Sequence, residues 1–191
     1  QPLSLFAARV HSVRVEIGFG GGEHLAREAL ANPEIGFIGC EPFVNGVAQA
    51  LMHIRDGGLT NVRLHHGDAL DVLRRIPDGA LSFVYLLHPD PWPKARHHKR
   101  RLLQSELVAD LARVLRPGGR LRFATDWADY ADWSLARALA LGDIGAVAVT
   151  DRAGRLVCAN ERYEDADLPV LPRPGRRYRP QSYGARRTRY L

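Results

Sequence analysis

Short apolar runs alternate with segments of helical periodicity along the first 140 residues of this 191-residue chain. After each run, apolar side chains recur every three or four positions, as on one face of a helix. The pairs are VRVEI with EHLAREALA, GFIGCE with FVNGVAQALMHI, NVRLHH with ALDVLRRI, LSFVYLL with LLQSELVADLARVL, and RLRFAT with WADYADWSLARALA. Strands that alternate with helices build a parallel sheet covered by helices on both faces. The pattern therefore predicts a doubly wound α/β fold.

Turn-forming residues and a repeated apolar spacing support these boundaries. Pro77–Gly79 and Arg116–Gly119 combine proline with glycine, so each is predicted to form a turn that ends a helix before the next strand. One helical segment also carries an apolar stripe that is expected to face the core, formed by Leu103, Leu107, Leu111 and Val114.

The pattern changes after residue 142. Here AVAVT and RLVCA flank the turn sequence Asp-Arg-Ala-Gly, which predicts an antiparallel hairpin. The remainder is rich in Arg, Pro, Tyr and Gly, and neither a second domain nor an internal repeat is visible. We therefore expect one domain over residues 1–191, with a basic C-terminal extension from about residue 168.

The positive charge is concentrated in two places. The formal net charge is +6, and five of the 27 Lys and Arg residues lie between Lys94 and Arg101. Seven more Arg residues lie between Arg173 and Arg189. Because a positive patch raises the local concentration of polyanions, an anionic partner is expected.

Several kinds of site and location are disfavoured by the sequence. Cys40 and Cys158 lie far apart without a Cys-x-x-Cys motif, so neither a disulfide framework nor a thiolate zinc site is predicted. His97 and His98 are adjacent rather than one helical turn apart, so no metal site is expected. No apolar run reaches the roughly 20 residues that span a bilayer, and the first residues lack the layout of a signal peptide. We expect a cytoplasmic protein with no membrane partner, either a monomer or a homodimer.

The first chemical motif is the glycine-rich segment EIGFGGG at residues 16–22. It lies between the first predicted strand and the first predicted helix, where glycines let a ligand approach the backbone. Glu41 ends the second strand about 20 residues later, at the position where such folds bind a ribose diol through a carboxylate. This combination predicts a nucleoside cofactor.

Acidic residues around the glycine-rich segment distinguish between nucleoside cofactors. A dinucleotide fingerprint needs glycine at position 23, but Glu23 stands there, at the helix N-terminus where a pyrophosphate binds. S-adenosylmethionine has no phosphate and carries a positive sulfonium, so Glu16 and Glu23 favour it over NAD. Asp68, in the sequence HGDA after the third strand, adds a carboxylate that can accept a hydrogen bond from an adenine amino group.

The most distinctive segment is HPDPWPKARHHKRR, residues 88–101, directly after the apolar run LSFVYLL. Pro89 and Pro91 restrict the backbone on both sides of Asp90, which favours a rigidly held carboxylate at the strand end. Trp92 offers either a stacking face or a side chain that packs beneath the loop. The cations that follow favour sequence-independent contacts with the phosphates of a nucleic acid.

From about Val13 to Trp133, the chain resembles the bacterial tRNA (guanine-N7-)-methyltransferase family. The matching stretches are EIGFGGGEHL, GCEPFVNGV, NVRLHHGDA, HPDPWPKARHHKRR, RPGG and ATDWADYA. The Pro-Asp-Pro-Trp element with its basic run is the most specific of them. The resemblance implies a Rossmann-like class I S-adenosylmethionine-dependent methyltransferase fold, and methyl transfer from that cofactor to N7 of a guanine in tRNA.

The resemblance also implies roles for individual residues. Those that would bind the cofactor are Glu16, Gly18, Gly20, Glu41, Asp68, Ala69 and Asp90. Asp90 would also be the central catalytic acid, and Lys94 and Asp126 would contact the target guanosine. Those that would contact tRNA are Arg96, His97, His98, Lys99, Arg100 and Arg101.

The resemblance weakens toward the C-terminus. Family members carry a Thr-x-Phe/Tyr-Glu element that completes the guanine pocket. Here Glu161–Glu164 keeps Tyr-Glu without the Thr, and Thr188–Tyr190 keeps the Thr without the Glu. Two alternatives therefore stay open: an S-adenosylmethionine-dependent methyltransferase acting on another RNA or a small molecule, and a non-catalytic RNA-binding module on the same fold. The acids retained at three strand ends argue against the second.

Overall fold

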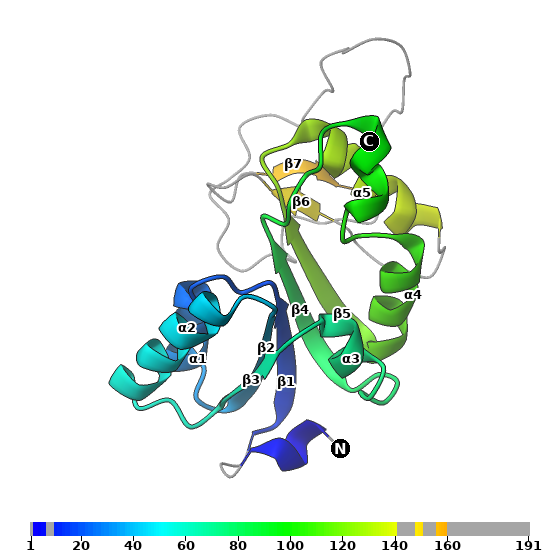
Figure 1. The fold of residues 1–191 in the computed structure, drawn as a ribbon. Helices are drawn as coiled ribbons and strands as arrows, with labels where there is room; N and C mark the ends of the chain where they lie inside the picture. Colours follow the sequence, from blue (N-terminus) through cyan, green and yellow to red (C-terminus); the bar gives the residue numbers. More distant parts are fainter. Residues whose placement is uncertain (1, 7–9, 141–147, 151–155, 160–191) are drawn as a thin grey trace. The chain divides into compact units, whose positions relative to one another are not determined.

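The computed structural model describes residues 2–6, 10–140, 148–150 and 156–159 (Figure 1). Its contacts divide the chain into two compact units. The first unit comprises Gln1–Leu87 and Ala109–Arg122, and the second comprises His88–Val108 and Phe123–Leu191. Compact units of this kind occur within single domains as well as between domains, so the expected single domain stays a prediction.

The first unit is built on a sheet with the strand order β3-β2-β1-β4-β5. The strand bounds are β1 Ser12–Ile17, β2 Ile35–Glu41, β3 Val62–His66, β4 Leu81–Leu87 and β5 Leu115–Ala124. β1 pairs in parallel with β2 and with β4, and β2 pairs in parallel with β3. The order reverses between β1 and β4, and folds of this kind bind ligands beyond the carboxyl ends of the strands at such a reversal.

This sheet packs against the helices α1 (Glu23–Ala31), α2 (Val44–Asp56) and α3 (Ala69–Leu73). The 3-10 helix η1 spans Pro2–Leu5, and α4 (Ser105–Val114) begins in the second unit and ends in the first. Every residue of β2 is buried, as expected for a strand covered on both faces. The core that packs α1 and α2 against the sheet consists of Phe19, Leu25, Ala29, Ile35, Phe37, Ala50, Val62 and Tyr85.

The second unit contains the short 3-10 helix η2 (Ala95–Arg100) and the helix α5 (Ala128–Ala140). The last residues of β5 pair in parallel with β6 (Ala148–Thr150), and β6 pairs antiparallel with β7 (Leu156–Ala159). The side chain of Tyr130 is fully buried, and its ring packs edge-on against Phe123. The start of α5 is therefore fixed against the end of β5.

The structure confirms the five predicted strand-helix pairs and the doubly wound α/β fold. The antiparallel pairing of β6 with β7 agrees with the predicted hairpin, although the connecting residues 151–155 lie outside the described residues. The predicted apolar stripe is buried throughout. The turn predicted at Arg116–Gly119 is instead part of β5. Gly118 has a left-handed φ of 73°, which accommodates a local distortion that only glycine adopts readily.

Candidate functional site

The glycine-rich segment forms an open backbone loop between β1 and α1. Gly18, Gly20 and Gly22 have φ values of 70°, 57° and 84°, a conformation that disfavours side chains. The amide of Gly18 donates to the carbonyl of Cys40 over 2.8 Å, which ties the loop to the end of β2. A Cβ added at Gly18 or Gly20 would meet no atom within 4 Å. The backbone here is therefore accessible to a ligand.

Helix α2 packs closely against this loop. A Cβ added at Gly46 would overlap the carbonyl oxygen of Gly20, and one added at Gly22 would lie 2.6 Å from the Cβ of Ala50. The absence of side-chain atoms at Gly46 and Gly22 thus allows the helix and the loop to touch. This contact determines where the loop backbone lies.

Glu41 connects the same loop to the start of α2. Its side chain is only 5% exposed. One carboxylate oxygen, Oε2, accepts a hydrogen bond from the amide of Gly20 over 2.9 Å, and Oε1 accepts one from the amide of Phe43 over 3.0 Å. An ionised carboxylate offers about four lone-pair positions, so Glu41 keeps capacity for further hydroxyl donors.

Glu16 lies at the end of β1 and begins a partly buried polar network. Its side chain is 3% exposed, and Oε2 lies 2.7 Å from Nδ1 of His24. The other ring nitrogen of His24 lies 4.0 Å from Glu28, which accepts a hydrogen bond from the Tyr85 hydroxyl over 3.0 Å. Burial raises the pKa of Tyr85 to about 12, with the Glu28 charge as a second cause, so its hydroxyl keeps its proton at neutral pH. His24 thus fixes the orientation of the Glu16 carboxylate.

Asp68 lies at the third strand end and is exposed. Its Oδ1 accepts from the amide of Leu70 over 2.9 Å, which caps the N-terminus of α3, and Ala69 beside it is buried. Burial, together with the negative charge of Asp68, raises the pKa of Cys40 to about 12. The amide of Gly67 donates to the carbonyl of Glu41 over 3.2 Å. The residues predicted to bind the cofactor in the first unit therefore gather at the carboxyl ends of β1, β2 and β3.

In the second unit, the loop that carries Asp90 is bounded by two strained residues. His88 and Trp92 have positive φ values of 50° and 43°, which cost of order 1 kcal/mol or more for a residue with a side chain. The amide of His88 donates to the carbonyl of Ala124 over 2.8 Å. Between them, Asp90 is exposed. Surrounding contacts must hold this loop, because its backbone conformation is unfavourable by itself.

Arg101, which is 1% exposed, contacts both this loop and α5. Its Nε donates to the carbonyl of Pro91 over 2.8 Å, and its Nη2 donates to Oδ2 of Asp129. The guanidinium lies over the rings of Tyr130 and Trp133, at 5.0 and 4.9 Å from the ring centroids. The sequence-based expectation of an exposed phosphate contact does not fit this burial.

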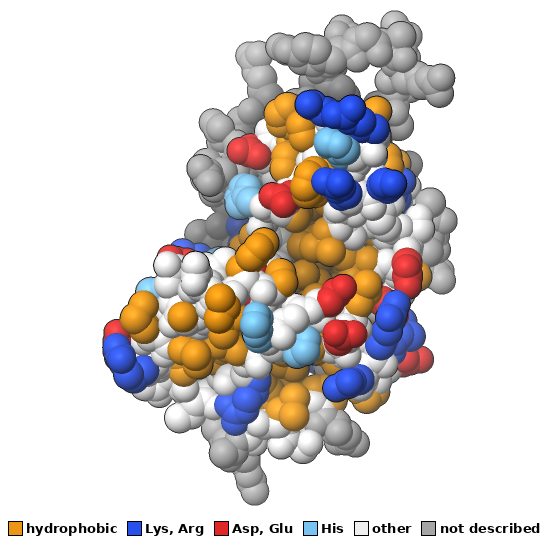
Figure 2. Space-filling view, in the orientation of Figure 1, with side chains coloured by type: hydrophobic (Ala, Val, Ile, Leu, Met, Phe, Trp, Pro, Cys, Tyr) orange, Lys and Arg blue, Asp and Glu red, His pale blue; other side chains and the backbone are white. Residues whose placement is uncertain are grey.

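The remaining residues of the basic run surround Trp92 and α5. Arg100 lies over the Trp92 ring at 5.0 Å, and the ring of His97 meets it edge-on at 5.9 Å. His98 packs edge-on against Trp133 at 5.1 Å. Trp92 therefore packs within the loop rather than presenting both ring faces to a ligand. The exposed side chains of the run are those of Lys94, Arg96, Lys99 and Arg100. Figure 2 shows Lys, Arg and His side chains gathered over η2.

Asp126 lies between β5 and α5 and is exposed. The preceding Thr125 is buried, and its hydroxyl accepts a hydrogen bond from the amide of Trp127 over 3.2 Å. The amides of Tyr130 and Ala131 then donate to the carbonyl of Trp127, each over 3.0 Å, and α5 begins. Asp126 is thus presented by a short turn fixed at both ends.

A family model described as "Putative methyltransferase" matches residues 10–152. The chain belongs to this methyltransferase family. A tRNA (guanine-N(7)-)-methyltransferase of Caulobacter vibrioides is 59% identical over 140 residues, which cover 73% of this chain and 62% of that protein. The chain thus spans about three-fifths of the length of this curated relative. The family resemblance predicted from the sequence is confirmed.

Solved structures support the methyltransferase fold. A precorrin-6y C5,15-methyltransferase of Geobacter metallireducens matches with a TM-score of 0.57 and 16% identity, over 76% of this chain and 71% of that one. A SAM-dependent methyltransferase of Aquifex aeolicus matches with a TM-score of 0.52 and 15% identity, over 76% and 78% of the two chains. At these identities the likeness establishes the fold alone.

Sequence reasoning about this methyltransferase missed several residues beside the predicted site. His24 orients Glu16, while Asp129, Tyr130 and Trp133 enclose Arg101. Trp133 lies four positions after Asp129 and three after Tyr130, and residues three or four apart on a helix are neighbours. This spacing indicated that Trp133 would lie beside both of them on α5. No signal in the sequence indicated that Arg101 would face inward.

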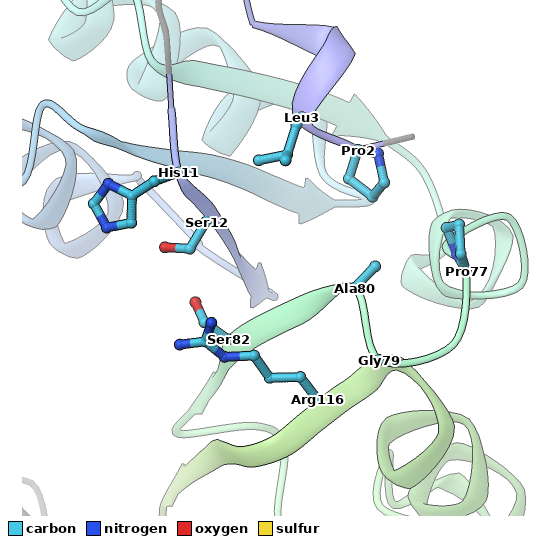
Figure 3. Close-up of a pocket in the computed structure, with 9 residues that line it drawn as sticks. All are labelled: Pro2, Leu3, His11, Ser12, Pro77, Gly79, Ala80, Ser82 and Arg116. Atoms are coloured by element: carbon cyan, nitrogen blue, oxygen red, sulfur yellow. The ribbon is translucent and has the colours of Figure 1, made fainter.

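A cavity of about 340 Å³ lies elsewhere in the first unit of the methyltransferase (Figure 3). Its lining includes Ser12 and Ser82, near the amino ends of β1 and β4, together with His11 and Arg116. The glycine loop follows the opposite, carboxyl end of β1, so this cavity is not part of the candidate site. Within the described residues, no cluster of His, Cys, Asp or Glu could hold a metal ion, and no helix is long and apolar enough to cross a membrane.

Proposed function

We propose that this protein transfers the methyl group of S-adenosylmethionine to N7 of a guanine in tRNA. The observation that carries this proposal is the Asp90 loop, whose Pro-Asp-Pro-Trp sequence has a strained backbone and accepts a hydrogen bond from the basic segment that follows it. The family membership and the name of the Caulobacter relative support the same reaction. Transfer RNA is then the partner, and the cytoplasm is the compartment.

The cofactor half of the proposal concerns the first unit. Open space over Gly18 and Gly20 leaves room for a nucleoside against the loop, and the Glu41 carboxylate binds its ribose hydroxyls. Asp68 accepts from the adenine amino group, with the backbone of Ala69 beside it. Glu16 attracts the positively charged end of the cofactor. The carboxylates of Glu16 and Glu23 beside the loop disfavour a pyrophosphate, so the residues present fit a cofactor without phosphate.

The substrate half concerns the second unit. S-adenosylmethionine supplies a methyl group on a sulfonium centre. Guanine N7 carries an in-plane lone pair, so no base is needed to remove a proton before attack. Asp90 accepts hydrogen bonds from N1–H or the N2 amino group of guanine, and it stabilises the positive charge that the base gains. Lys94 and Asp126 orient the guanosine, which places N7 in line with the methyl group.

Binding of the tRNA backbone is the role of the exposed cations over η2. Arg96, Lys99 and Arg100 present their charges to solvent, with His97 and His98 between them, and they bind backbone phosphates without reading the base sequence. The shape of the tRNA therefore guides recognition, and the guanine leaves its stack to reach the methyl group.

A methyl-transfer assay tests this function. The protein is incubated with labelled S-adenosylmethionine and, in parallel, unmodified bulk tRNA, ribosomal RNA or no RNA. Label in tRNA that is recovered as N7-methylguanosine supports the proposal, and aniline cleavage then maps the base. Label in ribosomal RNA alone would indicate a methyltransferase with another substrate. Binding of tRNA and cofactor without any transfer would indicate a non-catalytic RNA-binding module.

A further inference from the structure

We propose that Arg101 is a positioning residue that holds the Asp90 loop in its reactive conformation, and that it does not contact tRNA phosphate. This inference rests on the proposed function. It concerns a residue at the end of a basic run, whose sequence alone suggests an RNA contact. The structure separates Arg101 from the other cations of that run.

Burial is the first reason. Arg101 is 1% exposed, whereas Lys99 and Arg100 immediately before it are exposed. A phosphate contact requires a guanidinium that reaches the surface, and withdrawing an arginine from water is unfavourable unless its charge is compensated. Here the compensation comes from the Asp129 carboxylate and from the faces of Tyr130 and Trp133.

The positions of its partners give the second reason. Arg101 Nε donates to the carbonyl of Pro91, the residue directly after Asp90. Its Nη2 donates to Asp129, which lies in the first turn of α5, three residues after Asp126. One planar guanidinium therefore joins the segment that carries the catalytic acid to the segment that carries a proposed guanosine contact.

The backbone conformation of the loop gives the third reason. His88 and Trp92 both have positive φ, so the loop needs restraint from outside. The Pro91 carbonyl lies next to Trp92, where the strain is located. A hydrogen bond from a buried charged donor supplies that restraint, because charge-assisted hydrogen bonds are stronger than neutral ones.

Arg101→Lys tests the proposal with charge retained. A lysine ammonium lacks the planar fork, so it cannot reproduce both contacts in the same geometry. At saturating tRNA and cofactor, we expect kcat to fall at least about 10-fold, because small misplacement of reacting groups slows a reaction strongly. The KM for tRNA and the salt dependence of tRNA binding should stay close to those of the wild type.

Arg113→Lys is the matched control. Arg113 also bridges several partners, donating to the carbonyls of Ile76 and Leu73 and to the carboxylate of Asp78. Arg113 and these partners all belong to the first unit, whereas the Asp90 loop belongs to the second. Its replacement should lower the melting temperature without lowering kcat. A loss of kcat in Arg101→Lys that Arg113→Lys does not share is therefore not a consequence of lower stability.

Hydrogen exchange gives a readout that does not depend on activity. Peptides that cover residues 88–104 should exchange faster in Arg101→Lys than in the wild type, and should be unchanged in Arg113→Lys. Asp129→Asn should also speed exchange of these peptides. Combining it with Arg101→Lys should add little, since both substitutions remove the same interaction between Arg101 and Asp129.

The outcomes distinguish failure of the proposed methyl-transfer function from failure of the positioning role of Arg101. Absence of methyl transfer by the wild type would count against the proposed function, while the exchange experiment would still decide whether Arg101 holds the loop. Full kcat and unchanged exchange in Arg101→Lys would overturn the positioning role. A raised KM for tRNA and a shallower salt dependence in Arg101→Ala, with kcat intact, would instead identify a phosphate contact.

Discussion

The backbone amide of Gly20 donates a hydrogen bond to Oε2 of Glu41 over 2.9 Å. This bond joins the glycine loop to the carboxyl end of the neighbouring strand β2. The other oxygen of Glu41 accepts from the amide of Phe43, so a single carboxylate orders both the loop and the start of α2. A residue expected to bind the cofactor ribose therefore also orders the loop that is proposed to bind the cofactor.

Glu41→Gln should weaken cofactor binding by about 10- to 100-fold, because hydrogen bonds to a charged group contribute roughly 1.5–3 kcal/mol. Titration calorimetry with S-adenosylmethionine measures this affinity. Asp56→Asn, which removes an exposed carboxylate paired with Arg55 at the end of α2, is the control. Equal affinities of Glu41→Gln and the wild type would exclude the ribose contact.

Gly46→Ala should displace the glycine loop, because its new Cβ would overlap the carbonyl oxygen of Gly20. We expect a lower melting temperature and weaker binding of S-adenosylmethionine. Ala48→Gly on the same helix costs about 1 kcal/mol of helix stability without touching the loop, and it should leave cofactor affinity unchanged. If both variants bind the cofactor equally well, α2 does not position the loop.

Lys99→Ala should weaken tRNA binding at every salt concentration and reduce the slope of log affinity against log salt by about 1. Filter binding in a series of KCl concentrations measures both effects. Arg75→Ala, which removes a similar exposed charge from the turn after α3, is the control. An equal change of slope in Arg75→Ala would show that the phosphate contacts are not localised over η2.

Cys40 should resist alkylation in the folded protein. Its pKa is raised from 9.0 to about 12, first by burial and then by the charge of Asp68. At pH 8 only about one thiol in ten thousand is therefore ionised, and the thiolate is the reactive form. In a Cys158→Ser background, iodoacetamide should label Cys40 only after unfolding in guanidinium. Labelling of the folded protein at the rate of a free thiol would contradict this burial.

The fold was predictable because its signals are local. β2 and β4 are short runs of mostly apolar residues, and Glu41 ends the first of them, so its place at a strand end follows from the sequence. The beginning of β5 was not predictable in this way. Pro117 and Gly118 favour a turn, and only the pairing of the folded sheet includes them in a strand.

The positions of three acids of the candidate site along the strands were predictable, but the contacts of Arg101 were not. The spacing of Glu16, Glu41 and Asp68 placed three acids at strand ends, where the structure has them. The inward orientation of Arg101 depends on Tyr130 and Trp133, which are about 30 positions away in the chain. The basic run has no periodicity that marks Arg101 as its buried member. From the sequence alone, an RNA contact at Arg101 therefore could not be distinguished from a structural role.

The most direct measurement of the central claim is the turnover of Asp90→Asn on unmodified tRNA. This change keeps the shape of the side chain and removes its negative charge. We expect kcat for N7-methylguanosine formation to fall by about 100-fold or more, because stabilisation of the developing positive charge is lost. Binding of tRNA should stay close to that of the wild type. Wild-type turnover by Asp90→Asn would contradict the assignment of Asp90 as the group that stabilises the methylated base.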